Sequence, residues 1–311
     1  MSILLNADLE LRSGWRFAVY VAVFVVALYA TGAGLSLLIP GPEVLTGQFA
    51  LLGLTAASYG VPAAVALAFM IRFVDQVPVL TYGVGFHTRW LGDAGRGAAA
   101  GISMLALYSG GVVLTGTFRM RGPASEPSEL AAAGAVGLIL LVTAANEELI
   151  FRGYPLQALM AGIGIWPATV VMSALFAVGH LSNPNATWLG TANTFLAGIL
   201  LCLAYVRTRS LWLPWGIHVG WNLGLGPIFG FPLSGLDLSS IWTVEVTGAG
   251  WVTGGDYGPE GGILVTGVMV AALAVVGFTR WVRVSPEVSA LVDRHAGKVY
   301  RDSTLSSLGG S

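Results

Sequence analysis

The chain has 311 residues, of which 55% are hydrophobic and only 10% are charged, and its mean hydropathy is +0.76. A soluble domain carries about 25% charged residues, so this composition excludes an ordinary soluble protein and favours a membrane protein. The net charge of −1 gives no electrostatic basis for binding nucleic acid. The single cysteine, Cys202, lies in an apolar run, which excludes an intrachain disulfide.

Eight apolar segments are candidates for membrane-spanning helices. In chain order they cover residues 15–39, 48–73, 94–117, 129–151, 164–181, 190–206, 211–228 and 261–282. A span needs about 20 apolar residues, with a range of about 17 to 25, and the short fifth and seventh segments give the weakest signals. The first is too long for a signal-peptide core, so we expect it to remain as an anchor. The pattern predicts an all-α polytopic membrane protein with about eight transmembrane helices, forming one integral membrane domain over residues 1–311.

The basic residues predict the orientation of these spans. Eight spans place both termini on one side, and with the N-terminus inside, thirteen of the fifteen basic residues fall in inner segments. Only Arg119 and Arg121 fall outside. Because cytoplasmic segments are enriched in Arg and Lys, we expect both termini in the cytoplasm, an external loop over about 229–260 and a cytoplasmic tail over about 283–311. Fourteen arginines against one lysine point to a GC-rich genome and favour the plasma membrane of a prokaryote.

Three charged residues stand at the inner end of the fourth segment, in "AANEELIFRGYPLQAL". Glu148 and Arg152 are four residues apart and share one helix face, whereas Glu147 points about 100° away. We therefore expect Arg152 to pair with Glu148 and Glu147 to have no local partner. The plain alternative is that both glutamates are solvated at the membrane interface, but an ionisable group in a membrane segment is a functional hypothesis by default.

Two other segments carry polar groups among apolar residues. "FAVGH" ends the fifth and places His180 one turn after Phe176, while "HVGWN" in the seventh sets His218 and Asn222 one turn apart. His87 and His295 lie in predicted cytoplasmic segments and are expected to face solvent. A single histidine in an apolar helix is usually structural. The combination of two histidines, an asparagine and two glutamates on three helices is hard to explain as packing.

These three motifs, in this order across a polytopic chain, resemble those of the CAAX-prenyl-protease-like family. The family contains the eukaryotic type II CAAX endopeptidases and bacterial relatives that include proposed bacteriocin-immunity proteins. The resemblance covers about residues 130–226, which it identifies as the catalytic core. It implies an intramembrane endopeptidase, and the motifs match as catalytic and supporting residues Glu147, His180, His218 and Asn222, with Glu148 and Arg152 in support.

The chemistry of these side chains fits that resemblance. Peptide hydrolysis needs an activated water, donors to the developing oxyanion and a proton for the leaving amine. Glu147 and His180 can hold and deprotonate a water, and His218 and Asn222 can donate to the oxyanion. A zinc-dependent version stays open, with Glu147, His180 and His218 as ligands. We prefer a mechanism without a metal cofactor, since no His-Glu-x-x-His motif is present and neither histidine has an obvious carboxylate partner.

The expected partners are the lipid bilayer and a membrane-bound protein or peptide, with no nucleic acid. Eukaryotic relatives cleave three residues from a prenylated C-terminal cysteine, and a cavity in the inner leaflet suits a lipidated client. A proton-coupled transporter could use the same glutamates and histidines as a relay, and an inactive scaffold could keep the same fold. Transporters often show two related halves, and no such internal repeat is visible here.

The depth of His180 is the one geometric difficulty. Trp166 and His180 are fourteen residues apart, or about 21 Å of helix, which places His180 deeper than Glu147 if Trp166 marks the inner interface. A surface helix over residues 154–163 would lift the start of the fifth span and remove the difference. The apolar spacing of "GYPLQALMAG" is typical of such a helix.

Overall fold

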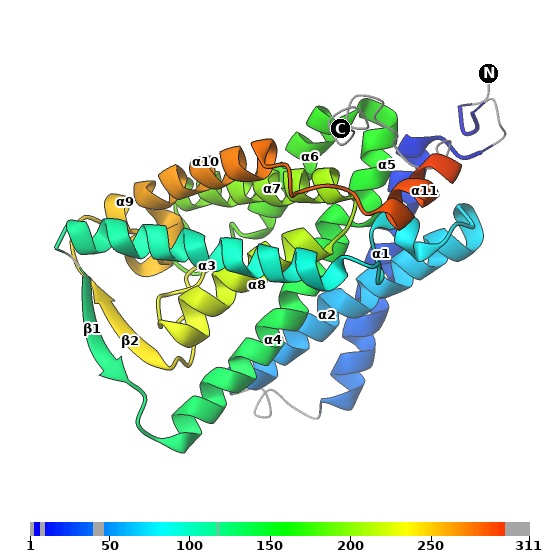
Figure 1. Ribbon diagram of the computed structural model, residues 1–311. Coiled ribbons are helices and arrows are strands. Elements are labelled where there is room, and N and C mark those ends of the chain that lie inside the picture. The colour runs from blue at the N-terminus through cyan, green and yellow to red at the C-terminus, as the bar shows by residue number, and fades with distance from the viewer. Residues whose placement is uncertain (1–2, 7–9, 40–46, 117, 296–311) are drawn as a thin grey trace.

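The computed structural model describes residues 3–6, 10–39, 47–116 and 118–295. It is mostly helical (Figure 1). The helices are α1 (Ser13–Leu38), α2 (Gln48–Phe69), α3 (Trp90–Leu114), α4 (Pro127–Arg152), α5 (Tyr154–Ile163), α6 (Ile165–Gly179), α7 (Trp188–Thr208), α8 (Trp212–Leu223), α9 (Gly250–Thr253), α10 (Ile263–Phe278) and α11 (Pro286–Arg294). A π-helical turn continues α2 over Met70–Val74 and α8 over Gly224–Ile228.

A helix forms at each of the eight predicted span positions. Five described helical segments are long and apolar enough to cross a membrane: α1, α2 with its π turn, α3, α4 continuing into α5, and α7. The helices α6 and α10 are apolar but have only 15 and 16 residues, and α8 has 12. The structure therefore supports a helical polytopic membrane protein. The count of eight spans and the cytoplasmic location of both termini stay predictions.

Large apolar side chains cover the outer faces of the helices. Val26 and Tyr29 on α1, Leu138 on α4 and Phe278 on α10 are each more than two-thirds exposed, at 69%, 76%, 68% and 89%. Soluble monomers rarely expose contiguous apolar patches larger than a few hundred Å², so these faces are suited to lipid. The buried core instead gathers between α3, α7, α8 and α10, around Leu200, Leu213 and Val265.

A two-stranded antiparallel sheet corrects the all-α prediction. Strand β1 (Phe118–Pro123) pairs with β2 (Trp242–Val246), with a bulge between Met120 and Gly122. Figure 1 shows both strands at the end of the molecule opposite α11. The segment 229–260 is therefore not one irregular loop, because it contains β2 and α9. Both strands alternate apolar and polar residues, as in "FRMR" and "WTVEV", but each is short and its partner is more than a hundred residues away, so the pairing was not predicted.

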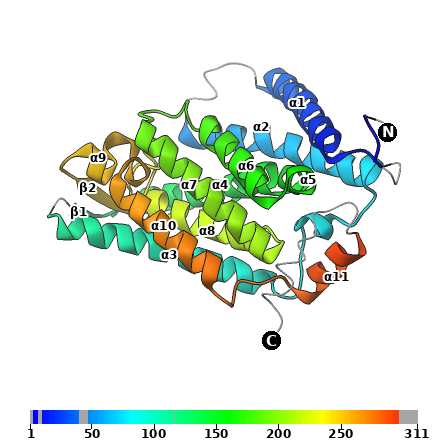
Figure 2. The same cartoon turned by 90° about the horizontal axis from the view of Figure 1, so that it is seen from above.

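The predicted tail begins with structure of its own. Helix α11 packs Val288 and Val292 into a cluster that includes Tyr20 of α1 and Tyr82, and it contacts the 3₁₀ turn Val79–Tyr82. Figure 2 shows α11 at the same end of the molecule as the start of α1. The N-cap Ser285 accepts a hydrogen bond from the Val288 N–H, which stabilises the start of the helix. Residues 296–311 of the predicted tail lie outside the described part of the chain.

Helices α3 and α8 pack closely along their lengths, and glycine permits this approach. A Cβ at Gly97 would lie 2.4 Å from the carbonyl oxygen of Leu213, and one at Gly216 would lie 2.3 Å from that of Ala94. Gly101 and Gly220, one turn further along each helix, make equivalent contacts. Small residues spaced four apart let membrane helices approach until their backbones touch. This contact fixes α8, which carries His218 and Asn222, against the core.

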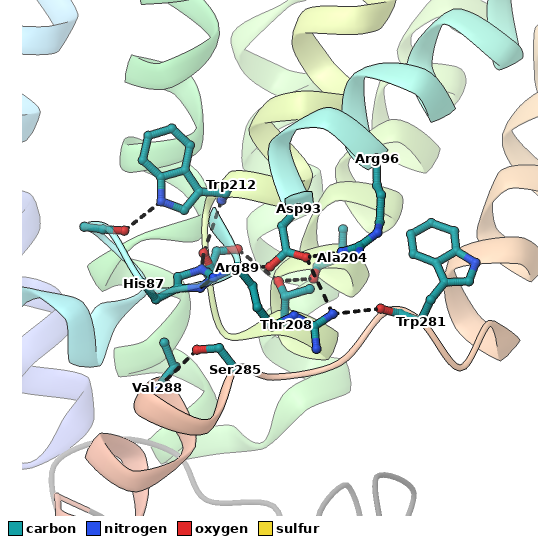
Figure 3. A network of polar contacts seen from close by, with 12 residues as sticks. His87, Arg89, Asp93, Arg96, Ala204, Thr208, Trp212, Trp281, Ser285 and Val288 are labelled. Atoms are coloured by element: carbon teal, nitrogen blue, oxygen red, sulfur yellow. Dashed lines mark hydrogen bonds and ion pairs between the residues drawn. The ribbon is translucent and has the colours of Figure 1, made fainter. Parts of the chain in front are cut away.

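A polar network anchors the start of α8 (Figure 3). The Trp212 indole N–H donates to the Gly85 carbonyl at 2.7 Å, and His87 Nε2 lies 3.0 Å from Ser210 Oγ. The backbone N–H of Arg89 donates to His87 Nδ1, so Nε2 carries the ring proton and donates to Ser210. Only 6% of His87 is exposed, so the prediction that it faces solvent was wrong. Burial lowers the pKa of His87 and favours this neutral form.

Helix α5 occupies the predicted bounds of 154–163 but is not a surface helix. Tyr154, Leu156 and Met160 are fully buried, and the helix contacts α1, α4 and α6. Gly153 ends α4, and Gly164, at φ 83°, separates α5 from α6. This helix of 10 residues separates the end of α4 from the start of α6.

Candidate active site

One cavity of about 470 Å³ contains all four predicted catalytic side chains in its wall: Glu147, His180, His218 and Asn222. Ligand sites typically have volumes of about 300 to 1,000 Å³. Glu147 comes from α4, His180 caps the end of α6, and His218 and Asn222 lie on α8. The three sequence motifs, spread over 76 positions from Glu147 to Asn222, therefore meet at one place.

The first motif is fixed by the geometry of α4. A capping box between Glu126 and Glu129, with Pro127 at the first helical position, starts the helix. At its C-terminal end Arg152 Nη1 lies 3.3 Å from Glu148 Oε1, and both side chains are almost completely buried. The predicted pairing of these two residues is present. Such a pair is costly to break, because the remaining partner becomes an uncompensated buried charge.

Phe176 connects the first motif with the second. The Arg152 guanidinium lies 4.3 Å from the centre of the Phe176 ring, a cation–π contact. The same ring lies 4.6 Å from the His180 ring and 6.2 Å from the His218 ring. Phe176 is therefore the packing centre between the buried ion pair and the two histidines, which gives a physical reason for its place in the motif.

His218 reaches both glutamates. Its Nδ1 lies 2.8 Å from Glu148 Oε1, and its Nε2 lies 3.7 Å from Glu147 Oε2. The two carboxylates do point to different places, because 26% of the Glu147 side chain is exposed against 1% for Glu148. The expectation that Glu147 has no local partner holds along α4, but His218 approaches it from α8. Glu147 Oε2 accepts no hydrogen bond from the described residues.

The hydrogen bonds of the two histidines define their chemistry. His180 Nδ1 lies 2.8 Å from the Phe176 carbonyl, which can only accept, so Nδ1 carries the proton and the neutral ring keeps Nε2 as an acceptor. His218 Nδ1 donates to Glu148, and the doubly protonated ring carries a second proton on Nε2. In that form the His218 Nε2–H is a donor. Asn222, one turn further along α8, makes no hydrogen bond with the described residues through its side chain.

Two observations concern the zinc-dependent alternative. Glu148 is a carboxylate partner for His218, which is the arrangement that orients metal-bound histidines, so one argument raised against zinc was wrong. Within the described residues, no three histidine, cysteine, aspartate or glutamate side chains come together as a metal-ligating group. Glu147, His180 and His218 share the cavity without forming such a group.

Sequence reasoning missed several residues of the same cavity. Trp221, Ser234 and Glu260 belong to its wall, together with Asn193 of α7 and Tyr59 of α2. Glu260 lies in the segment predicted as an external loop. Trp221 stands between two motif residues and could have been noticed from its position. Nothing in the local sequence marks Ser234 or Glu260, because both reach the cavity through long-range contacts.

Residues 129–224 match the family model described as type II CAAX prenyl endopeptidase Rce1-like. This confirms the resemblance that the motifs predicted, and the matched range contains all three motifs. No curated protein and no solved structure gives a match to the chain. The match and the apolar helices together support an intramembrane endopeptidase in general terms.

Proposed function

We propose that this protein hydrolyses a peptide bond of a membrane-associated or lipidated protein, with Glu147 as the general base. The observation that carries the proposal is the convergence of Glu147, His180, His218 and Asn222 from three helices on one cavity. The buried Glu148–Arg152 ion pair and the contact between α3 and α8 fix the positions of these four side chains. Catalytic groups need such rigid support, because small displacements weaken a preorganised site.

The proposed reaction begins with a water held between Glu147 and His180. The Glu147 carboxylate, whose side chain is 26% exposed and lies in the cavity wall, accepts one hydrogen bond from the water. His180 Nε2 accepts a hydrogen bond from the second O–H of the water, which keeps that proton. Glu147 takes a proton as the water oxygen attacks the peptide carbonyl, and the carbonyl oxygen becomes an oxyanion. The Asn222 amide and the His218 Nε2–H donate to that oxyanion.

The second step breaks the carbon–nitrogen bond. Glu147 returns its proton to the peptide nitrogen, which leaves as an amine, and the oxyanion collapses to a carboxylic acid that then ionises. In this mechanism Glu148 and Arg152 do not contact the substrate but position the residues that do. Glu148 orients His218 through its Nδ1, and Arg152 balances the buried Glu148 charge.

The substrate follows from the setting of the cavity. Its wall is mostly apolar and its helices have lipid-suited outer faces, so a client that is itself embedded in the bilayer or anchored by a lipid is favoured. We place the protein in the plasma membrane of a prokaryote, on the arginine bias of its sequence. In that setting a membrane protein or a peptide precursor is a more suitable client than a prenylated one.

The test of this function compares membranes from cells that produce the protein with membranes from cells that lack it. Enrichment and sequencing of peptide termini should reveal new C-termini in membrane proteins only when the protein is present. A transporter or a scaffold creates no new termini. Identical sets of termini in both membranes would remove the protease proposal and favour those alternatives.

A second prediction concerns metal. In the glutamate-base mechanism, exhaustive chelation of purified protein should leave the cleavage rate unchanged, and elemental analysis should find well below one zinc per chain. Buffer-exchanged protein without chelator is the control. One zinc per chain that is lost in His180→Ala, together with activity restored by added zinc, would establish the zinc-dependent version with Glu147, His180 and His218 as ligands.

A further inference from the structure

A second carboxylate, Glu260, lies in the wall of the same cavity, and the protein holds it firmly. The Trp221 indole N–H donates to Glu260 Oε1 at 3.1 Å, and the Ser234 backbone N–H donates to Oε2 at 2.7 Å. The Ser234 hydroxyl also donates to Oε2. The Glu260 carbonyl oxygen accepts from the Asn193 amide at 2.8 Å. Contacts from α7, α8 and the 233–236 turn therefore fix both the backbone and the carboxylate.

None of these donors carries a charge that could balance Glu260. Within the described part of the chain, no arginine, lysine or histidine nitrogen lies within 4.0 Å of its carboxylate, although eight other such pairs are present. The described residues in the cavity wall include no lysine and no arginine. A partly buried carboxylate held by neutral donors keeps an unbalanced negative charge, and an opposite charge brought close to it is stabilised.

The position of Glu260 relates it to the reacting groups. Its partner Trp221 follows His218 by three residues, which is about 4.5 Å along the axis of α8. An extended peptide advances about 3.3 Å per residue, so this offset corresponds to between one and two substrate residues. A long side chain near the scissile bond can therefore reach Glu260 while the carbonyl lies at Asn222 and His218.

We infer that Glu260 forms a subsite for a cationic group of the substrate, a lysine or arginine side chain or a free amine. The inference rests on the proposed function for its placement beside the scissile bond. The site itself rests on the fixed, unbalanced carboxylate in the cavity wall. It selects clients that combine an apolar or lipidated segment with one positive charge at a set distance from the cleaved bond.

Binding tests this inference without requiring cleavage. The purified protein in nanodiscs is incubated with a defined mixture of lipid-anchored peptides in which each position holds lysine or its uncharged analogue norleucine. Bound peptides are identified by mass spectrometry. Wild type should enrich lysine about 10- to 100-fold at one position, the range expected for a hydrogen bond between charged groups. Glu260→Gln should abolish the enrichment. The matched control Asp256→Asn removes an exposed carboxylate in the same segment that lies outside the cavity wall, and should keep it.

The Glu147→Gln variant separates this inference from the proposed function. It should bind lysine peptides with the wild-type preference while cleaving none of them. If Glu260→Gln weakens binding of lysine and norleucine peptides equally, Glu260 only positions α8 and the inference fails. It fails too if wild type shows no lysine enrichment, or if Glu147→Gln alone removes it. Cleavage at the wild-type rate by Glu147→Gln, with an intact lysine preference, would leave the subsite standing and overturn only the proposed reaction.

Discussion

Replacing Glu147 with Gln should lower kcat of peptide hydrolysis by about 10²- to 10⁴-fold, the usual contribution of a general base. Gln keeps the volume and the hydrogen-bonding capacity of Glu147 but cannot take the proton of the attacking water. The Glu147 side chain is partly exposed, at 26%, and its Oε2 has no hydrogen bond to lose among the described residues. The fold should therefore tolerate the change. Single-turnover cleavage of a peptide identified in the membrane comparison measures the effect.

Two variants control this prediction. Glu147→Asp keeps a carboxylate on a shorter side chain and should recover part of the lost rate. Glu245→Gln removes a partly exposed carboxylate that pairs with Arg121 on the sheet, and should leave kcat unchanged. A Gln variant that cleaves at the wild-type rate would show that Glu147 is not the base. Equal loss in the Gln and Asp variants, with lowered thermal stability in both, would indicate a structural role.

Replacing Asn222 with Ala should lower kcat by about 10²- to 10³-fold with a smaller change in KM, because an oxyanion donor acts mainly in the transition state. The Asn222 side chain makes no hydrogen bond with the described residues, so its loss removes no internal contact of that kind. Steady-state kinetics on the same peptide separate kcat from KM.

The matched control is Asn146→Ala, in the same cavity wall. Asn146 donates its amide to the Ala56 carbonyl at 2.8 Å, a contact between α4 and α2. Its loss should lower the melting temperature while kcat stays within a few-fold of wild type. If Asn222→Ala raises KM and leaves kcat intact, Asn222 binds substrate and does not stabilise the oxyanion. Comparable kcat losses in both variants would point to disruption of the cavity.

The parts of the site that the sequence predicted correctly depend on helical periodicity. Glu148 and Arg152 are one turn apart, and their pairing follows from that spacing alone. The divergence of Glu147 from Glu148 follows from the 100° step of the helix. The bounds of α5 were also readable from apolar spacing, but its burial was not, because burial depends on α1, α4 and α6 packing around it.

The parts that could not be predicted are contacts between distant segments. His218 bonds to Glu148 across seventy positions, and Glu260 meets Trp221 across thirty-nine. The pairing of β1 with β2 and the contact of His87 with Ser210 also join segments more than a hundred residues apart. The Gly-x-x-x-Gly spacings of α3 and α8 are visible in the sequence, but the spacing alone does not indicate which helix packs against which.

Isotope incorporation from water tests the central claim most directly. Purified wild-type protein and its Glu147→Gln variant are incubated separately with isolated membranes in water enriched in oxygen-18, and new peptide C-termini are analysed by mass spectrometry. Hydrolysis by a Glu147-activated water places one heavy oxygen in each new terminal carboxylate. We expect a defined set of labelled termini with the wild-type protein and none above background with the variant. Labelled termini of equal abundance in both incubations, or none in either, would contradict the account.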